Sequence, residues 1–157
     1  MKDGLHFTKR EKINEQDCLV KHTFLKPIEA GETLVNLSEL RLGKVKIDID
    51  DYEFNGDDSK ILFTTNTESV YRRSFFANYL VYDLKTKQLQ ELDSHRSPQM
   101  LAEYSPDGMQ VSYLFENNLY VKELSSGKVK QITKDGKHNA IINGFDTPTG
   151  CTCDLFD

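Results

Sequence analysis

The feature that most limits the possible folds of this chain is an internal repeat of an aromatic residue, a turn and a strand. Residues 54–63 read FNGDDSKILF and recur as residues 104–113, YSPDGMQVSY, at an offset of 50. Downstream, residues 79–84 (YLVYDL) recur as residues 119–124 (LYVKEL), at an offset of 40. The first copy therefore holds about ten extra residues around 66–76, and insertions in a repeat usually map to one functional face.

The local hydrophobic period is two, which predicts strands rather than helices. Between Asn118 and Leu124, Leu119 and Val121 alternate with Tyr120 and Lys122, as in a half-buried strand. The same alternation covers residues 128–132 and 78–84. Turn signals such as the Ser-Pro-Asp-Gly of residues 105–108 separate these runs. Strands spaced by about ten residues favour an antiparallel all-β fold.

A period of 40 to 50 residues with four short strands is typical of a β-propeller blade. A third, more degraded copy begins near Leu5 and continues to Val35. We therefore predict a partial, about three-bladed β-propeller in residues 1–144, with blades at 4–42, 46–92 and 99–133, followed by a divergent tail at 145–157. Since propellers close with about four to eight blades, a β-sandwich-like packing is the alternative.

Composition excludes several classes of protein. The 157 residues are 38% hydrophobic and 29% charged with a net charge of −5, which fits one globular unit and disfavours a disordered chain or a fibre. No run approaches the roughly 18 apolar residues of a spanning helix, and the first residues form no signal peptide. Because Lys and Arg do not cluster, we expect no nucleic-acid partner.

Several segments resemble, in the same order, the amino-terminal propeller of the dipeptidyl peptidase IV branch of the prolyl oligopeptidase family. The resemblance implies a propeller over a separate carboxy-terminal α/β-hydrolase domain that holds the catalytic Ser, Asp and His. No Gly-x-Ser-x-Gly motif occurs here, so we expect no catalytic residue in this chain and no activity alone. The matching segments are residues 51–54 (DYEF), 65–68 (TNTE), 71–75 (YRRSF), 79–84 (YLVYDL), 104–108 (YSPDG), 117–121 (NNLYV) and 141–144 (IING).

The resemblance also implies one substrate contact. The family places an arginine of the inserted loop beside the substrate, where it orients the peptide carbonyl, and the matching residue is Arg72. A planar guanidinium keeps its charge and holds an oxygen in a fixed direction. Arg73 is the alternative, because the family often has His at its position. The other interpretation is two solvated arginines on a loop.

The resemblance ends at Phe145. The family continues with a pair of glutamates that bind the amino terminus of the substrate, whereas this chain continues to Asp157 without them and contains no Trp. We expect a truncated or frame-shifted copy of a longer gene. Cys151 and Cys153 have no metal-ligand spacing, so we expect neither a metal nor a cofactor.

The sequence thus predicts the propeller fragment of a serine exopeptidase that releases amino-terminal Xaa-Pro or Xaa-Ala dipeptides. In the parent enzyme this part would gate access and orient the peptide substrate, with the hydrolase domain as its partner. The resemblance implies a periplasmic or extracellular site, in the bacterial envelope. The alternative function is a stand-alone protein-binding module. In either case we expect self-association through exposed strand edges.

Overall fold

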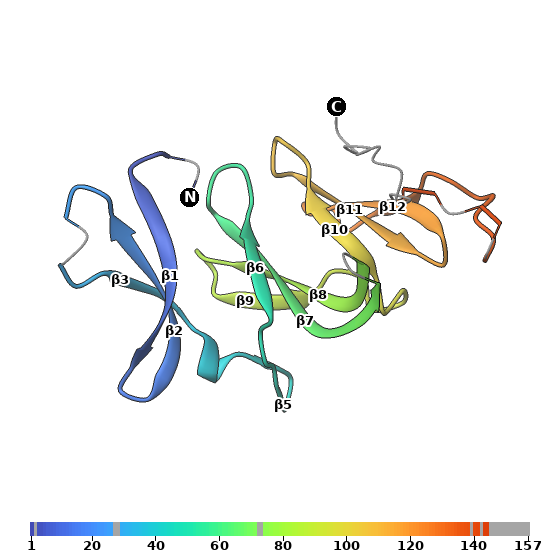
Figure 1. Ribbon diagram of the computed structural model, residues 1–157. Helices are drawn as coiled ribbons and strands as arrows, with labels where there is room; N and C mark the ends of the chain where they lie inside the picture. The colour runs from blue at the N-terminus through green and yellow to red at the C-terminus, as the bar shows by residue number, and fades with distance from the viewer. Residues whose placement is uncertain (2, 27–28, 72–73, 139, 142, 145–157) are drawn as a thin grey trace.

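The structure is a computed structural model that describes residues 1–144, apart from residues 2, 27–28, 72–73, 139 and 142. Arg72, Arg73, Cys151 and Cys153 therefore lie outside the described residues. Three antiparallel sheets follow one another along the chain and stand side by side, with the second sheet between the other two (Figure 1). Nowhere in the described part is there a helix with the length and apolar character needed to cross a membrane.

The first sheet has three strands, one fewer than the four expected of a blade. Its strands are β1 (His6–Ile13), β2 (Gln16–Thr23) and β3 (Glu32–Asn36), in that order. The side chain of Asn36 accepts a hydrogen bond from the Ser38 amide at 3.1 Å and caps the short 3-10 helix η1 (Leu37–Glu39). The chain turns away from the sheet at this cap. It next forms a separate two-stranded pair, β4 (Arg41–Leu42) with β5 (Val45–Lys46).

The second and third sheets each have four strands in sequence order, as the repeat predicts. The second comprises β6 (Asp51–Phe54), β7 (Lys60–Tyr71), β8 (Ser74–Asp83) and β9 (Gln88–Glu91). The third comprises β10 (Met100–Tyr104), β11 (Gln110–Phe115), β12 (Asn118–Glu123) and β13 (Val129–Gln131).

The second sheet is buried on both faces. Ile61 and Phe63 on β7 pack into a core shared with the first sheet, which includes Leu19 and Val35. Leu62, between them, points the other way into a core shared with the third sheet, which includes Tyr113. Because alternate residues of one strand serve two cores, the sheets form a stack of successive blades. This is the predicted partial propeller, and the sandwich alternative is not realised.

The turns of the two repeats match in detail. In the second sheet, the Asn55 side-chain oxygen accepts a hydrogen bond from the Lys60 amide at 2.8 Å. Fifty residues later, the Ser105 hydroxyl oxygen accepts one from the Gln110 amide at 3.0 Å. The two turns also touch, because a Cβ built on Gly56 would lie 2.8 Å from the Pro106 carbonyl oxygen. Neighbouring sheets are thus held together at their turns as well as through their cores.

Candidate functional site

The candidate site is a hairpin that extends beyond the second sheet. In the third sheet, β11 and β12 close at the pair Phe115 and Asn118, with a two-residue turn. The equivalent pair in the second sheet is Thr65 and Asn78, but β7 and β8 continue to pair as far as Tyr71 and Ser74. Residues 66–77 therefore form an arm absent from the third sheet, which we call the hairpin arm. This confirms the insertion that the two repeat offsets predicted around residues 66–76.

The two arginines singled out from the sequence follow β7 and precede β8. Tyr71 and Ser74 are the last paired residues of the hairpin arm, and Arg72 and Arg73 are the two residues between them. Both arginines lie outside the described residues, so their role in binding stays a prediction.

The described part of the hairpin arm is irregular and presents both apolar and acidic groups. The pairing of β7 with β8 shifts between Thr65 and Glu68 and again before Tyr71. Asn66 adopts a φ of 52°, in the left-handed region that Asn tolerates better than most residues. Glu68, which is exposed, pairs with Phe76, whose side chain is 37% exposed. An aromatic ring beside a carboxylate is a surface that suits a peptide with an apolar side chain and a positive amino terminus.

The β7 side of the hairpin arm is held at its base by the segment that precedes the second sheet. The buried Thr65 donates its hydroxyl hydrogen to the Asp48 carbonyl at 2.7 Å. The Asp50 carboxylate accepts a hydrogen bond from the Thr67 amide at 3.0 Å. Arg10, on β1, donates to the Ile49 carbonyl at 2.9 Å and so links this segment to the first sheet.

Sequence reasoning gave no role to the acidic residues at positions 50, 51, 53 and 68. The structure shows that two of them, Asp50 and Asp51, make different contacts. Asp50 supports the base of the hairpin arm, whereas the Asp51 carboxylate accepts a hydrogen bond from the adjacent Tyr52 amide at 2.8 Å. The contact of Asp50 crosses 17 residues to an inserted loop, so no local pattern could have identified it.

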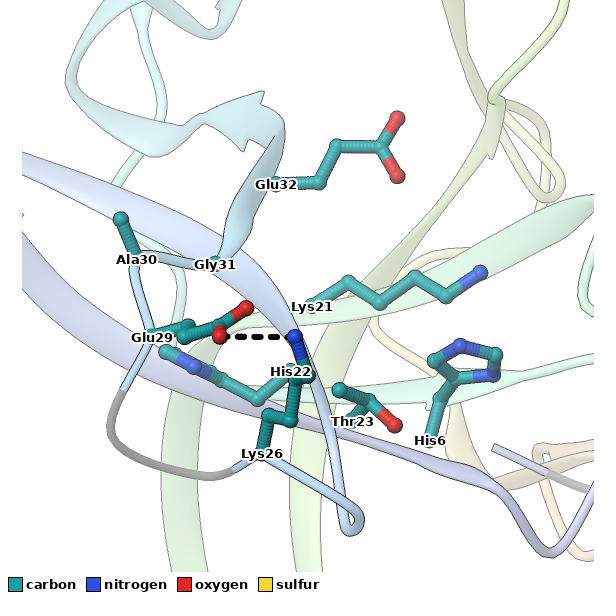
Figure 2. A pocket seen from close by; sticks show the side chains of 9 residues that line it. All are labelled: His6, Lys21, His22, Thr23, Lys26, Glu29, Ala30, Gly31 and Glu32. Carbon is teal, nitrogen blue, oxygen red and sulfur yellow. Dashed lines mark hydrogen bonds and ion pairs between the residues drawn. The ribbon is translucent and has the colours of Figure 1, made fainter.

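A second candidate site is a hollow on the first sheet, near the end of β2 and the start of β3, with a volume of about 220 Å³ (Figure 2). The ring of the buried His22 stacks on Phe7 with 5.3 Å between ring centroids. Lys26 and Glu29, three residues apart in the loop after β2, form an ion pair at 2.9 Å (Figure 2). The lining residues are His6, Lys21, His22, Thr23, Lys26, Glu29, Ala30, Gly31 and Glu32.

The charges around this hollow offset one another, since two lysines face two glutamates. His6 is engaged with Asp3, whose carboxylate lies 2.5 Å from its Nδ1, and this hydrogen bond holds the pKa of Asp3 below its ordinary value. Among the described residues, no group of three or more His, Cys, Asp or Glu side chains could hold a metal ion. The hollow therefore selects no ligand class, and the hairpin arm remains the better candidate.

Comparison with known proteins points to one family. The family model of the dipeptidyl peptidase IV (DPP IV) N-terminal region matches residues 55–147, more than half of the chain, and this range includes the hairpin arm. Dipeptidyl peptidase 4 of Felis catus is 29% identical over 136 residues, which are 85% of this chain and 18% of the cat protein. The chain spans less than a fifth of the length of such curated relatives.

Solved structures agree. The crystal structure of Porphyromonas gingivalis dipeptidyl peptidase 4 superposes with a TM-score of 0.75 at 31% identity, over 87% of this chain and 19% of that chain. The tricorn protease superposes with a TM-score of 0.56 at 14% identity, over 87% of this chain and 13% of that chain, and so shares the fold alone. The chain belongs to the family of dipeptidyl peptidase IV N-terminal regions.

Proposed function

We propose that this chain is the substrate-orienting propeller part of a dipeptidyl peptidase IV-like serine exopeptidase, which releases Xaa-Pro or Xaa-Ala dipeptides from peptide amino termini. The observation that carries the proposal is the hairpin arm, which extends the second sheet beyond Thr65 and Asn78 and carries the Tyr-Arg-Arg-Ser-Phe segment of the family. In this proposal the catalytic nucleophile belongs to the hydrolase domain. The role of this chain is to gate access and to hold the peptide for that domain.

In this proposal Arg72 donates hydrogen bonds to a peptide carbonyl oxygen, with Arg73 as the alternative donor. A hydrogen bond from a charged donor contributes about 1.5–3 kcal/mol, because the charge strengthens it relative to a neutral pair. The exposed Glu68 and Phe76 lie on the same arm. They would offer a carboxylate and an apolar surface to the amino-terminal end of the peptide.

A chimera tests the proposal directly. Residues 1–144 replace the matching region of Porphyromonas gingivalis dipeptidyl peptidase 4, and release of p-nitroaniline from Gly-Pro-p-nitroanilide is measured. We expect the chimera to be active and Arg72→Gln to lower kcat/KM by about 10- to 100-fold, as the loss of one charged hydrogen bond predicts. Arg41→Gln is the matched control, because Arg41 is an exposed arginine on β4, away from the hairpin arm.

Each outcome of this assay separates the alternatives. A loss caused by Arg73→Gln but not by Arg72→Gln assigns the role to the second arginine. Full activity of both single variants and of the double variant, in a chimera that folds, contradicts a substrate role for either arginine.

A stand-alone protein-binding module is the second candidate function, and the first sheet favours it. Leu5, Phe24 and Leu25 near its strand ends are 57%, 59% and 83% exposed. Apolar side chains gathered at one place often mark an interaction surface. We therefore propose that the free chain self-associates through this sheet. Sedimentation velocity checks this: dimers or larger species should appear as concentration rises, and Phe24→Ser with Leu25→Ser should restore the monomer.

A further inference from the structure

The hairpin arm has a second point of attachment, on its β8 side. From Asp83 back to Leu80, β8 pairs with β9, and the Leu92 amide still donates to the Tyr79 carbonyl at 2.8 Å. At Ala77 the partner changes. The Ala77 amide donates to the Gln99 carbonyl at 2.9 Å, and the Gln99 amide donates to the Ala77 carbonyl at 2.8 Å. The base of the arm is thus paired with the connection between the second and third sheets.

This connection, residues 93–99, is held in shape by its own side chains. Gln99 is 1% exposed, and its side-chain Nε2 donates to the Asp93 carbonyl at 2.9 Å and to the Arg96 carbonyl. The Asp93 carboxylate accepts hydrogen bonds from the His95 amide at 3.0 Å and from Arg96 at 2.9 Å. Ser97 donates to the Asn78 side-chain oxygen at 2.6 Å, which adds a further contact with β8.

The same connection is tied to the third sheet. The Tyr113 hydroxyl, on β11, donates to the Asp93 carboxylate, and the Arg96 guanidinium lies 4.8 Å from the centroid of the Tyr120 ring on β12. Burial raises the pKa of Asp93, but the hydrogen bonds from Tyr113, Arg96 and the His95 amide outweigh it and hold the pKa below its ordinary value. Asp93 is therefore a buried carboxylate that remains charged while it joins the connection to β11.

The hairpin arm needs such support. A two-stranded hairpin alone is at best marginally stable in water, because it has no third strand or packed face. Within the arm, β7 pairs only with β8, and this pairing is irregular at the left-handed Asn66. Further contacts of the arm near its base include the pairing of Ala77 with Gln99 and the packing of Phe75 against the core shared with the third sheet. The direction of the arm must then be set by what contacts its base.

We propose that Asp93 and Gln99 are positioning residues, which fix the direction of the hairpin arm relative to the third sheet through the bridge to Ala77 and the contact with Tyr113. This proposal concerns the direction of the arm. It rests on the proposed function only for the biological use of the arm, which is to present Arg72 to a peptide. Neither residue touches the substrate. Sequence alone assigns them no role, because their partners lie on different sheets.

Distance measurements between spin labels test this without any peptide. One pair joins Glu68→Cys on the arm to Lys130→Cys on β13, and a reference pair joins Gln90→Cys on β9 to Lys130→Cys; all three sites are exposed. The full chain carries Cys151→Ser and Cys153→Ser, while Cys18 is 4% exposed and stays unlabelled.

We expect Gln99→Leu to shift the arm distance or to broaden its distribution about twofold, since the arm loses a fixed base. The reference distance between the second and third sheets should not change. Tyr113→Phe, which removes one hydroxyl, should also shift or broaden the arm distance. This variant provides the test if Gln99→Leu does not fold. Lys122→Met is the matched control, because Lys122 contacts the Leu92 and Glu91 carbonyls between the same two sheets but lies outside the connection.

An unchanged arm distance in both variants overturns the proposal. An equal change in the arm and reference distances also overturns it, because the residues would then hold the two sheets together without a specific effect on the arm. Since no substrate is present, the result is independent of whether Arg72 binds a peptide.

Discussion

The second and third sheets are two copies of one repeat, and they differ at one hairpin. The third sheet closes with a two-residue turn at Glu116 and Asn117, both with positive φ. The end of this turn is occupied by later parts of the chain, since the Asn143 amide donates to the Asn117 carbonyl at 3.2 Å. The second sheet instead extends into the hairpin arm. Two copies of a repeat can therefore keep the same core and turns while one of them carries an additional hairpin.

The cores of the two sheets offer the strongest test of their equivalence. Phe63 and Tyr113 occupy matching positions at an offset of 50, and both are fully buried. Phe63→Ala should lower the free energy of unfolding by about 3–5 kcal/mol, because a large cavity remains. Tyr113→Phe should cost about 1–3 kcal/mol, since only the hydrogen bond to the buried Asp93 is lost. Urea denaturation measures both, and an unchanged free energy of unfolding in Tyr113→Phe would contradict a stabilising hydrogen bond from Tyr113 to Asp93.

The matching turns provide the next test. Gly108 has a φ of +69°, and a Cβ there would lie 2.8 Å from the Gly56 amide nitrogen. Gly108→Ala should therefore destabilise the protein by about 1–3 kcal/mol, from strain and from the close approach of the two turns. Gly127→Ala is the control for strain alone, because its φ is +70° with no atom within 4 Å of an added Cβ. If both variants lose the same stability in thermal unfolding, the contact between the turns contributes nothing.

Acid titration tests the carboxylate of Asp83, at the last residue of β8. Hydrogen bonds from the Thr86 amide and from Lys60 lower the pKa of Asp83 to about 2, against an ordinary 3.8. Because the folded pKa lies below the unfolded one, the stabilisation is present above pH 3.8 and is lost as pH falls toward 2. With solvent screening we expect roughly 1 kcal/mol.

Asp83→Asn should remove this pH dependence in urea denaturation curves measured from pH 5 to pH 2. Glu123→Gln, at the matching position of the third sheet, is the control. If the stability of the Asp83→Asn variant falls with pH as steeply as that of the wild type, the group responsible is not Asp83.

Converting one hairpin into the other is expected to affect activity more than stability. Replacement of residues 66–77 by the Glu-Asn of the third sheet keeps the ladder up to Thr65 and Asn78, and loop length has a weak entropic effect. It also removes the fully buried Ala77 and its two hydrogen bonds with Gln99, so we expect the free energy of unfolding to fall by about 1–3 kcal/mol. The same change should abolish peptidase activity in the chimera. Unfolding of the shortened protein would show that the arm belongs to the core.

Much of the fold was predictable from local signals. The alternation of Leu119 and Val121 with Tyr120 and Lys122, and the turns that contain Gly56 and Gly108, support the strand and repeat assignments directly. The four-stranded expectation was wrong for the first sheet, where Asn36 caps a 3-10 helix instead of leading into a fourth strand. The cap is a side-chain hydrogen bond with the Ser38 amide, and hydrophobic periodicity carries no information about such a contact.

The candidate site divides in the same way. The sequence by itself determined that two repeats exist, that one carries about ten extra residues, and that these contain Arg72 and Arg73. Repeats and alternation can be recognised from the order of residues along the chain alone. Only the tertiary structure decided that Gln99 pairs with Ala77 and that Asp93 meets Tyr113. The first contact joins the second sheet to the connection, and the second joins the connection to the third sheet. Both therefore arise from how the blades stack, which no local pattern encodes.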